Sequence, residues 1–464
     1  MAPAVTILDR DTIAAIATPV GRGGIGVVRI SGARAMEIAN RVCSTVPEPR
    51  RVGISDFRDH RGQVVDQGVV LRFVGPASFT GEDVVELQGH GGPVVMDLLL
   101  ESALAAGARL ANPGEFTQRA YLNGKIDLAQ AEAVADLIDA ASRSAVVGAS
   151  RSLRGEFSDR IGRLAAQLRE LRAFVEAAID FPEEEVDFLA DGQVSARLED
   201  VVGAVQAVAD TARQGVLLND GMRVVLAGKP NVGKSSLLNK LTGDERAIVT
   251  PQAGTTRDLV HADIVIDGLP LTVTDTAGLR TSGDLVEREG VRRAHGAIED
   301  ADLVLLVVEA GEVAQGLVGR VQALEADVLG TTKTNDRLAR LTIVINKIDL
   351  TEDEPGLTVL EGWQAVRLSA LTGAGVSLLR EHLKALAGYR AEEGVFLARR
   401  RHLDALQRCL EALALGERAL VEQGAGELLA EDLRLAHDAL GEIVGRVSSD
   451  ELLGDIFGSF CIGK

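Results

Sequence analysis

The chain has 464 residues, of which 46% are hydrophobic and 25% charged, as expected for a soluble globular protein of about two to four domains. Its formal net charge is −19, so the chain as a whole repels nucleic acid, and any RNA contact requires a local basic patch or a basic partner. Three widely separated cysteines, Cys43, Cys409 and Cys461, argue against a disulfide framework and against a cysteine-rich metal site.

The N-terminal residues and the longest apolar runs indicate where the protein is located. The first residues include Asp9, Arg10 and Asp11 and do not have the cationic and apolar pattern of a signal peptide. No apolar run reaches the roughly 18 residues needed to span a bilayer. We therefore expect a cytoplasmic protein in a reducing compartment.

The first 124 residues mix short strands with glycine-rich turns. Apolar or alternating runs predict strands at residues 13–18, 26–30, 67–73 and 83–88, and helical periodicity predicts a helix over residues 94–106. The glycine cluster at residues 21–26 resembles a dinucleotide fingerprint but lacks the long helix and the ribose-binding acid that should follow. An α+β domain over residues 1–124 is predicted, without a Rossmann site.

Helical character dominates the next segment and returns near the end of the chain. Residues 129–142 and 161–179 are rich in alanine and leucine, and the acidic stretch that follows is interrupted by Pro182. Helical patterns resume at residues 401–423 and 428–447. The simplest architecture is a helical domain formed by residues 125–217 and 389–464, with an α/β P-loop domain of residues 218–388 inserted in it.

A phosphate-binding loop, GKPNVGKS, occupies residues 228–235, between the strand-like residues 222–227 and the helix-like residues 236–241. In such a loop the backbone N–H groups cradle phosphates, Lys234 reaches the β- and γ-phosphates, and the Ser235 hydroxyl is offered to Mg²⁺. A chance glycine-rich turn is the alternative for this loop alone.

Three further motifs follow in the order that a GTPase requires. DTAG at residues 275–278 can hold Mg²⁺ through its carboxylate, and NKID at 346–349 ends with Asp349, which can accept from guanine N1–H and N2–H₂. Adenine lacks that donor pair, so the site should select GTP over ATP. SAL at residues 369–371 fits a backbone contact to guanine O6. A turn or a helix cap explains each short motif alone, but not the ordered set.

The segment between these motifs carries the predicted switch. Thr256 can close over Mg²⁺ and the γ-phosphate, whereas Leu279 stands where Ras-type enzymes carry a water-positioning glutamine. Asn231 could bind a monovalent cation beside the phosphates, and K⁺ there could supply the charge of an arginine finger. The acids Asp284, Glu287 and Glu289 could orient water, although their spacing alone favours a solvated helix start.

The sequence ends in FCIGK, which places the Cys461 thiol three residues from Lys464. A nearby ammonium lowers the pKa of a thiol, whereas the terminal carboxylate opposes this effect. From the sequence alone Cys461 is interpreted as a buried or frayed bystander.

Several longer motifs together resemble the MnmE (TrmE) family of tRNA-modification GTPases over the full length of the chain. They are ATPVGRGGIGVVRISG at residues 17–32, GEDVVELQGHGGP at 81–93, NPGEFTQRAYLNGKIDLAQAEAVADLI at 112–138, the nucleotide motifs and the terminal CIGK. The N-terminal and terminal motifs are much more specific than the phosphate loop, which many GTPases share. Under this resemblance Cys461 and Glu287 become candidate catalytic groups beside Lys234.

The resemblance implies the ligands of three sites. A tetrahydrofolate, such as the 5,10-methylene form, is expected at Arg29, Glu86, Lys125 and Lys464, where cations suit the anionic tail and Glu86 can accept from pteridine N–H groups. Mg²⁺ is expected at Ser235 and Thr256, and K⁺ at Asn231, Thr250, Gln252 and Thr255. The residues expected to contact GTP are Asn231, Val232, Gly233, Lys234, Ser235, Ser236, Thr250, Pro251, Gln252, Ala253, Gly254, Thr255, Thr256, Asp275, Thr276, Ala277, Gly278, Asn346, Lys347, Asp349, Ser369, Ala370 and Leu371.

The resemblance also implies partners and a reaction. It implies a homodimer formed through the N-terminal domains, and a heterotetramer with the flavoprotein MnmG (GidA). The reaction expected is addition of an aminomethyl or carboxymethylaminomethyl group to C5 of the wobble uridine of certain tRNAs, with K⁺-dependent GTP hydrolysis and Glu287 positioning water. The alternatives are a GTP-driven assembly factor, and a folate-binding or structural protein whose nucleotide domain only switches conformation.

Overall fold

The computed structural model describes residues 11–180, 193–242, 260–275, 301–313, 341–351, 353–360, 362–390, 394–447 and 449–463. The chain divides into two compact units. The first unit comprises Met1–Ala135, Leu153–Ser195 and Ala412–Lys464, and the second comprises Asp136–Ser152 and Ala196–Glu411. No helix in the described ranges has both the length and the hydropathy that crossing a bilayer requires.

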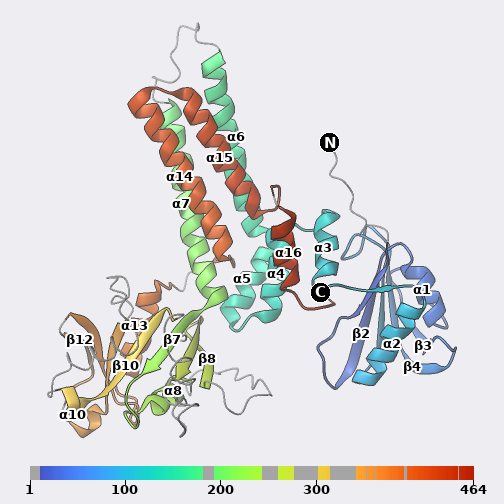
Figure 1. Cartoon of the computed structure of the whole chain (residues 1–464), viewed down its shortest axis with the longest axis horizontal. Helices are drawn as coiled ribbons and strands as arrows, with labels where there is room; N and C mark the ends of the chain where they lie inside the picture. The colour runs from blue at the N-terminus through green and yellow to red at the C-terminus, as the bar shows by residue number, and fades with distance from the viewer. Residues whose placement is uncertain are drawn as a thin grey trace, which may run out of the picture. The chain divides into compact units, whose positions relative to one another are not determined.

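The first unit contains a six-stranded sheet in the order β3-β4-β5-β2-β1-β6, with antiparallel neighbours except for the parallel pair β1–β6 (Figure 1). The strands are β1 (Ile13–Ile16), β2 (Gly23–Ser31), β3 (Val52–Arg58), β4 (Val64–Phe73), β5 (Val84–Gly91) and β6 (Arg109–Leu110). Helices α1 (Ala35–Val42) and α2 (Pro93–Ala105) bury their apolar sides against this sheet. The predicted α+β character of this region is confirmed.

The glycine cluster lies at the beginning of β2 and does not form a nucleotide fingerprint. The pairing of β2 with β5 shifts register between Gly23 and Gly26, and a Cβ on Gly26 would lie 2.3 Å from the sulfur of Met96 in α2. Glycine is therefore needed here for close packing of helix on sheet. Rejection of a Rossmann site is thus supported. Helix α1 and strand β3 were not predicted: α1 has only 8 residues, although Ala35, Ile38, Ala39 and Val42 have helical spacing, and β3 alternates over only part of its length.

A partly buried ion network joins the chain segment before β1, strand β6 and helix α3 (Glu115–Leu122). Arg119 contacts Glu115 at 2.9 Å, Asp11 at 2.7 Å and Glu82 at 3.1 Å, while Arg109 contacts Glu115 at 2.7 Å. Burial acts to raise the pKa of Glu115, but hydrogen bonds from Arg109, Asn112 and Arg119 outweigh it and hold that pKa below its ordinary value.

The helices of the first unit include α6 (Glu156–Asp180), α15 (Gly426–Ile443) and α16 (Asp450–Gly458), and α6 and α15 lie side by side (Figure 1). The predicted helix over 428–447 is too long, because Gly445 adopts φ 78° and ends α15 with a left-handed turn. The helix predicted at 129–142 is α4 (Leu128–Asp139), and it also ends early. Phe457 and Phe460 pack with Leu128 and Ala131 in a small apolar cluster.

The second unit contains a seven-stranded sheet in the order β12-β13-β11-β10-β7-β9-β8. Its strands are β7 (Met222–Ala227), β8 (Val260–Ile266), β9 (Leu269–Asp275), β10 (Leu303–Glu309), β11 (Leu341–Asn346), β12 (Gly356–Leu360) and β13 (Trp363–Arg367). The inner strands are parallel, and the edge strands β8 and β12 are antiparallel to their neighbours. This is the α/β sheet predicted for the inserted domain.

Helices α8 (Lys234–Thr242) and α13 (Val376–Ala387) pack on one face of this sheet, where they share an apolar core with β7, β9 and β10. The other described helices are α5 (Arg143–Leu153), α7 (Gln193–Asp220), α10 (Ala310–Val313), α14 (Arg400–Gln423) and the 3-10 turn η3 (Ile348–Leu350). Strand β7 has the predicted bounds. The sheet lies within residues 218–388, and the domain boundaries at 124, 217 and 388 stay predictions.

Candidate functional site

The phosphate loop follows the central strand β7 and leads into α8. Gly228, Asn231 and Gly233 have φ values of 141°, 65° and 97°, which is the left-handed backbone that wraps N–H groups around an anion. A Cβ on Gly228 would lie 2.3 Å from the carbonyl oxygen of Val307 in β10, so no larger residue fits there. The predicted loop is therefore formed by backbone geometry that its glycines permit.

Lys234 and Ser235 begin α8. Lys234 is 4% exposed, and its Nζ donates to the carbonyl oxygens of Gly228 at 2.8 Å and Lys229 at 2.9 Å, which places the ammonium over the loop. The Ser235 hydroxyl donates to Oδ2 of Asp275 at 3.1 Å, so the first residue of DTAG lies beside the loop. A hydroxyl and a carboxylate are oxygen ligands that suit Mg²⁺ directly or through water.

Asn346 joins the phosphate loop to the predicted base-binding edge. Its Nδ2 donates to the carbonyl oxygen of Val232 at 2.8 Å, and its Oδ1 accepts from the N–H of Ala370 at 2.9 Å. The side chain is 2% exposed, and a Cβ on Gly233 would lie 2.2 Å from its Nδ2. This bridging role was not predicted. It also uses the Ala370 N–H within the protein, so the predicted SAL contact to guanine O6 stays a prediction.

Asp349 lies at the surface of the same edge. Its Oδ1 accepts from the Ser369 hydroxyl at 2.5 Å, and the oxygen of Ser369 accepts from the Thr372 N–H at 3.2 Å. Lys347, with φ 65°, is ion-paired to Glu309 at the end of β10. The NKID and SAL segments therefore lie together, as their motif order predicts, with an exposed carboxylate held in place.

Several predicted site residues lie outside the residues that the structure describes. They are Thr250, Pro251, Gln252, Ala253, Gly254, Thr255, Thr256, Thr276, Ala277, Gly278, Asp284, Glu287, Glu289 and Lys464. Among the predicted K⁺ ligands, the structure describes Asn231, which is exposed.

A second cluster of predicted residues lies on the N-terminal sheet. Pairing of β2 with β5 sets Arg29 opposite Glu86, and the Arg29 Nε donates to Oε1 of Glu86 at 3.0 Å. The guanidinium also lies 5.7 Å from the ring centroid of Phe79 and 5.6 Å from that of Phe116. Cation–π contact and the ion pair together fix the orientation of Arg29.

Lys125 contacts the loop that carries Phe79. The loop joins β4 to β5, and its Pro76 carbonyl oxygen accepts from the Lys125 Nζ at 2.8 Å. Lys125 is exposed. Arg29, Glu86 and Lys125 are therefore brought to one loop of the first unit, although they are far apart in sequence.

The C-terminal tail lies against the same region. Residues Pro113 and Ile462 form a β-bridge, and the Gly114 N–H donates to the carbonyl oxygen of Cys461 at 3.3 Å. A Cβ on Gly463 would lie 2.2 Å from the carbonyl oxygen of Ile16, so the backbones approach closely. The interpretation of Cys461 as buried or frayed is wrong, because its side chain is exposed while its backbone is hydrogen-bonded.

The ordered loop, the hydroxyl–carboxylate pair and the NKID–SAL edge on a parallel sheet define a P-loop guanine-nucleotide-binding domain. The chain also matches two family models: the GTP-binding protein TrmE N-terminus over residues 12–125 and the MnmE helical domain over residues 128–461. The chain belongs to the MnmE (TrmE) family of tRNA modification GTPases.

Curated relatives resemble the chain over almost its entire length. It is 55% identical over 462 residues to the tRNA modification GTPase MnmE of Chromohalobacter salexigens, covering 99% of this chain and 100% of the relative. It is 53% identical over 455 residues to the MnmE of Hydrogenovibrio crunogenus, covering 98% and 99%. Among solved structures, the G domain of the T. maritima FeoB iron transporter is 26% identical and covers 36% of this chain and 98% of its own, with a TM-score of 0.26.

Proposed function

We propose that this chain is a K⁺-dependent GTP hydrolase that acts with MnmG to install an aminomethyl or carboxymethylaminomethyl group at C5 of the wobble uridine of certain tRNAs. The observation that carries this proposal is the pairing, in one chain of this family, of an assembled guanine-nucleotide site with the Arg29, Glu86 and Lys125 cluster. An assembly GTPase has no need of the second cluster.

The nucleotide site supports GTP as the substrate. Asp349 would accept from guanine N1–H and N2–H₂, a donor pair that adenine lacks, so these charge-assisted hydrogen bonds would favour GTP over ATP. Lys234 would exchange its two carbonyl partners for phosphate oxygens, which are stronger acceptors. Ser235 and Thr256 would hold Mg²⁺, whose charge stabilises the phosphate oxygens when it is bound.

The proposed route to hydrolysis uses K⁺ in place of an arginine finger. Asn231 lies in the loop with positive φ and an exposed side chain, so it is accessible to a cation beside the phosphates. Thr250, Gln252 and Thr255 would complete the K⁺ site, and Glu287 would orient the attacking water. Leu279 stands where Ras-type enzymes carry a glutamine that positions water, so K⁺ and Glu287 would have to take over that role.

The N-terminal cluster supports a tetrahydrofolate, such as 5,10-methylenetetrahydrofolate, as one-carbon donor. Glu86 would accept from pteridine N–H groups, while Arg29, Lys125 and Lys464 suit the anionic tail. The docked tail also brings the exposed Cys461 thiol to this region. A homodimer, a heterotetramer with MnmG, tRNA as substrate and a cytoplasmic location complete the proposal.

Steady-state GTP turnover in K⁺ and in Na⁺ buffers tests the hydrolytic part. We expect turnover in K⁺ and at most about one tenth of it in Na⁺. Glu287→Ala should lower kcat at least about tenfold, equivalent to ~1.4 kcal/mol, with GTP affinity unchanged. Equal rates in the two salts would contradict the K⁺ mechanism.

Mass spectrometry of tRNA nucleosides tests the modification part. A cell in which Cys461→Ser replaces the native chain should lose the modified wobble uridine but keep GTP turnover, because a hydroxyl has a far higher pKa than a thiol. Normal modification in the serine variant would return Cys461 to a bystander role. Absence of 5-formyltetrahydrofolate binding by titration calorimetry would favour the assembly-factor alternative.

A further inference from the structure

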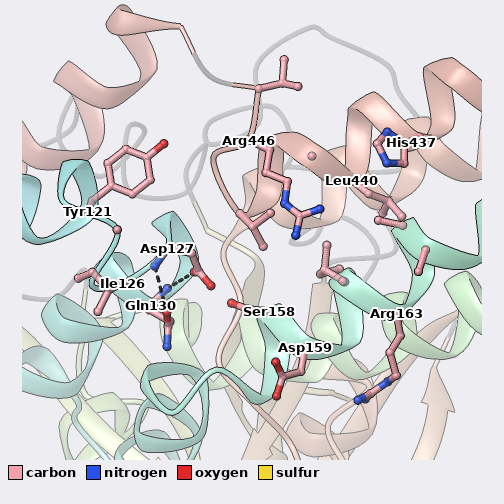
Figure 2. A pocket seen from close by; sticks show the side chains of 18 of the residues that line it. Tyr121, Ile126, Asp127, Gln130, Ser158, Asp159, Arg163, His437, Leu440 and Arg446 are labelled. Carbon is pink, nitrogen blue, oxygen red and sulfur yellow. Dashed lines mark hydrogen bonds between the residues drawn. The ribbon is translucent and has the colours of Figure 1, made fainter. Parts of the chain in front are cut away.

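A pocket of about 770 Å³ opens in the first unit between the segment after α3, helix α6 and the end of α15 (Figure 2). Its volume lies in the range of about 300–1,000 Å³ typical of sites for small organic ligands. Its apolar lining includes Ile126, Ile161, Leu440 and Val444. Nothing in the proposed function so far uses this pocket, except that Lys125 belongs to its lining as well as to the N-terminal cluster.

The polar groups of the pocket are mainly donors. Lys125, Arg163 and Arg446 line it, and Figure 2 shows the Arg446 guanidinium extending into its middle. Within the described part of the chain, neither arginine side chain makes an ion pair. The Ser158 hydroxyl and the His437 Nε2 are buried and have no hydrogen-bond partner among the described residues. A buried hydroxyl and a buried imidazole nitrogen without a partner call for a polar group on a ligand.

The two carboxylates in the lining, Asp127 and Asp159, do not offset the positive charge of Lys125, Arg163 and Arg446. Asp127 is used locally, because its Oδ1 accepts from the Gln130 N–H at 2.9 Å and caps α4. Asp159 lies in the first turn of α6, where the helix dipole favours a negative charge. The lining therefore contains three cations against two carboxylates, one of which caps a helix, in a chain whose overall net charge is −19.

We propose that this pocket binds the γ-linked polyglutamate tail of the folate whose pteridine lies at Glu86. The inference rests on the proposed function, which sets the pteridine at Glu86 and the anionic tail at Arg29, Lys125 and Lys464; of these, Lys125 also lines the pocket. A tail that continues past Lys125 enters the pocket. Each further glutamyl unit then presents one carboxylate to Arg163, Arg446, Ser158 or His437, and its methylene groups pack on the apolar lining.

An RNA strand fits these observations less well. Phosphodiester binding without base readout uses an extended basic groove with aromatic platforms. Here the cations belong to a single pocket. Tyr121 in its lining already contacts Phe457 at a centroid distance of 6.2 Å and donates its hydroxyl to the Gly445 carbonyl at 2.7 Å. A short, flexible carboxylate chain is the better match.

Titration calorimetry on the full chain tests the proposal with two probes, 5-formyltetrahydrofolate carrying one glutamate and the same compound carrying five. We expect the pentaglutamate to bind at least about tenfold more tightly, with a gain that shrinks as NaCl rises. The double variant Arg163→Ala/Arg446→Ala should bind both compounds equally. Arg169→Ala, which removes an exposed cation of α6 outside the pocket, should keep the tenfold ratio.

Four other outcomes would overturn the proposal in distinguishable ways. Equal affinity of the native chain for both compounds would remove the tail site and leave the folate site intact. Binding of neither compound would remove the folate site, and the tail site with it. A pentaglutamate gain that the double variant retains, at an unchanged melting temperature, would place the tail elsewhere. An oligouridylate that competes with the pentaglutamate for the native chain, but not for the double variant, would assign the pocket to RNA.

Discussion

In the nucleotide site the backbone does most of the positioning, whereas in the N-terminal cluster charged side chains do. Gly228, Asn231 and Gly233 shape the phosphate loop through their positive φ values, and Asn346 holds that loop by a main-chain carbonyl. Arg29 and Glu86 instead hold each other across two strands. Backbone sites tolerate few substitutions but depend little on charge, while a site built from ion pairs depends on both partners being present.

The largest effect is expected at Lys234, whose ammonium lies over the phosphate loop. Lys234→Ala should lower GTP turnover by about a thousandfold, or ~4 kcal/mol, because no other group replaces the ammonium over the loop. The rate of phosphate release, sampled at fixed times, measures GTP turnover. Arg223→Ala, an exposed cation at the other end of β7, should have no effect; a loss below tenfold in Lys234→Ala would show that the loop backbone alone suffices.

A buried ion pair in the N-terminal domain should give the next largest effect, on stability. Glu115→Gln leaves Arg109 and Arg119 short of a charged partner and should lower the free energy of unfolding by about 3 kcal/mol. Chemical denaturation measures it, and Glu170→Gln on the exposed side of α6 is the control.

The same variant has a defined pH signature. The pKa of Glu115 is lowered on folding, so its contribution is complete above the ordinary value of 4.5 and is lost as pH falls through the lower folded value. The native chain should therefore lose stability below about pH 4.5, and Glu115→Gln should lose less over that window. Parallel pH curves for the two proteins would show that Glu115 is not the group responsible.

Asn346→Ala sharpens the comparison, because it removes a side chain that acts only on backbone groups. The Val232 carbonyl and the Ala370 N–H both lose their partner, so GTP affinity should fall about thirtyfold, or ~2 kcal/mol. Fluorescent-nucleotide titration measures it, with exposed Asn239→Ala as control. A fall in tetrahydrofolate affinity as well would mean that the variant disturbs more than the nucleotide site.

The smallest effect is expected from the ion pair of the N-terminal cluster. Glu86→Gln keeps the shape of the side chain but removes its charge, and should weaken 5-formyltetrahydrofolate binding about tenfold, or ~1.4 kcal/mol, with GTP turnover unchanged. Glu101→Gln, exposed on α2, should change neither. Unchanged folate affinity in Glu86→Gln would detach this carboxylate from the site.

The sequence predicts the nucleotide site well because its parts are short and contiguous. Strand β7 and the loop after it follow from one run of residues, and the glycines at 228 and 233 have the φ values that such a loop requires. The bridge from Asn346 to Val232 could not be predicted, because it spans 114 residues and depends on the order of strands in the sheet.

The N-terminal cluster is visible in the sequence only through family resemblance. Arg29, Glu86 and Lys125 have no common spacing, and strand pairing and one loop bring them together. Short elements such as α1 and β3 were missed because of their length: α1 has helical spacing over only 8 residues, and helices this short depend on tertiary packing. The docking of the C-terminal tail also escaped local reasoning, because it is a long-range backbone contact.

The Asn346 bridge has a consequence for folding of the chain during its synthesis on the ribosome. The phosphate loop is synthesised early, but the amide that holds its Val232 carbonyl is added 114 residues later, and the Ala370 N–H that holds the amide comes later still. Until those residues emerge, the nascent loop lacks its anchor. We therefore expect nucleotide capture to begin only after β13 has left the exit tunnel, so that GTP stabilises the completed domain and not its precursors.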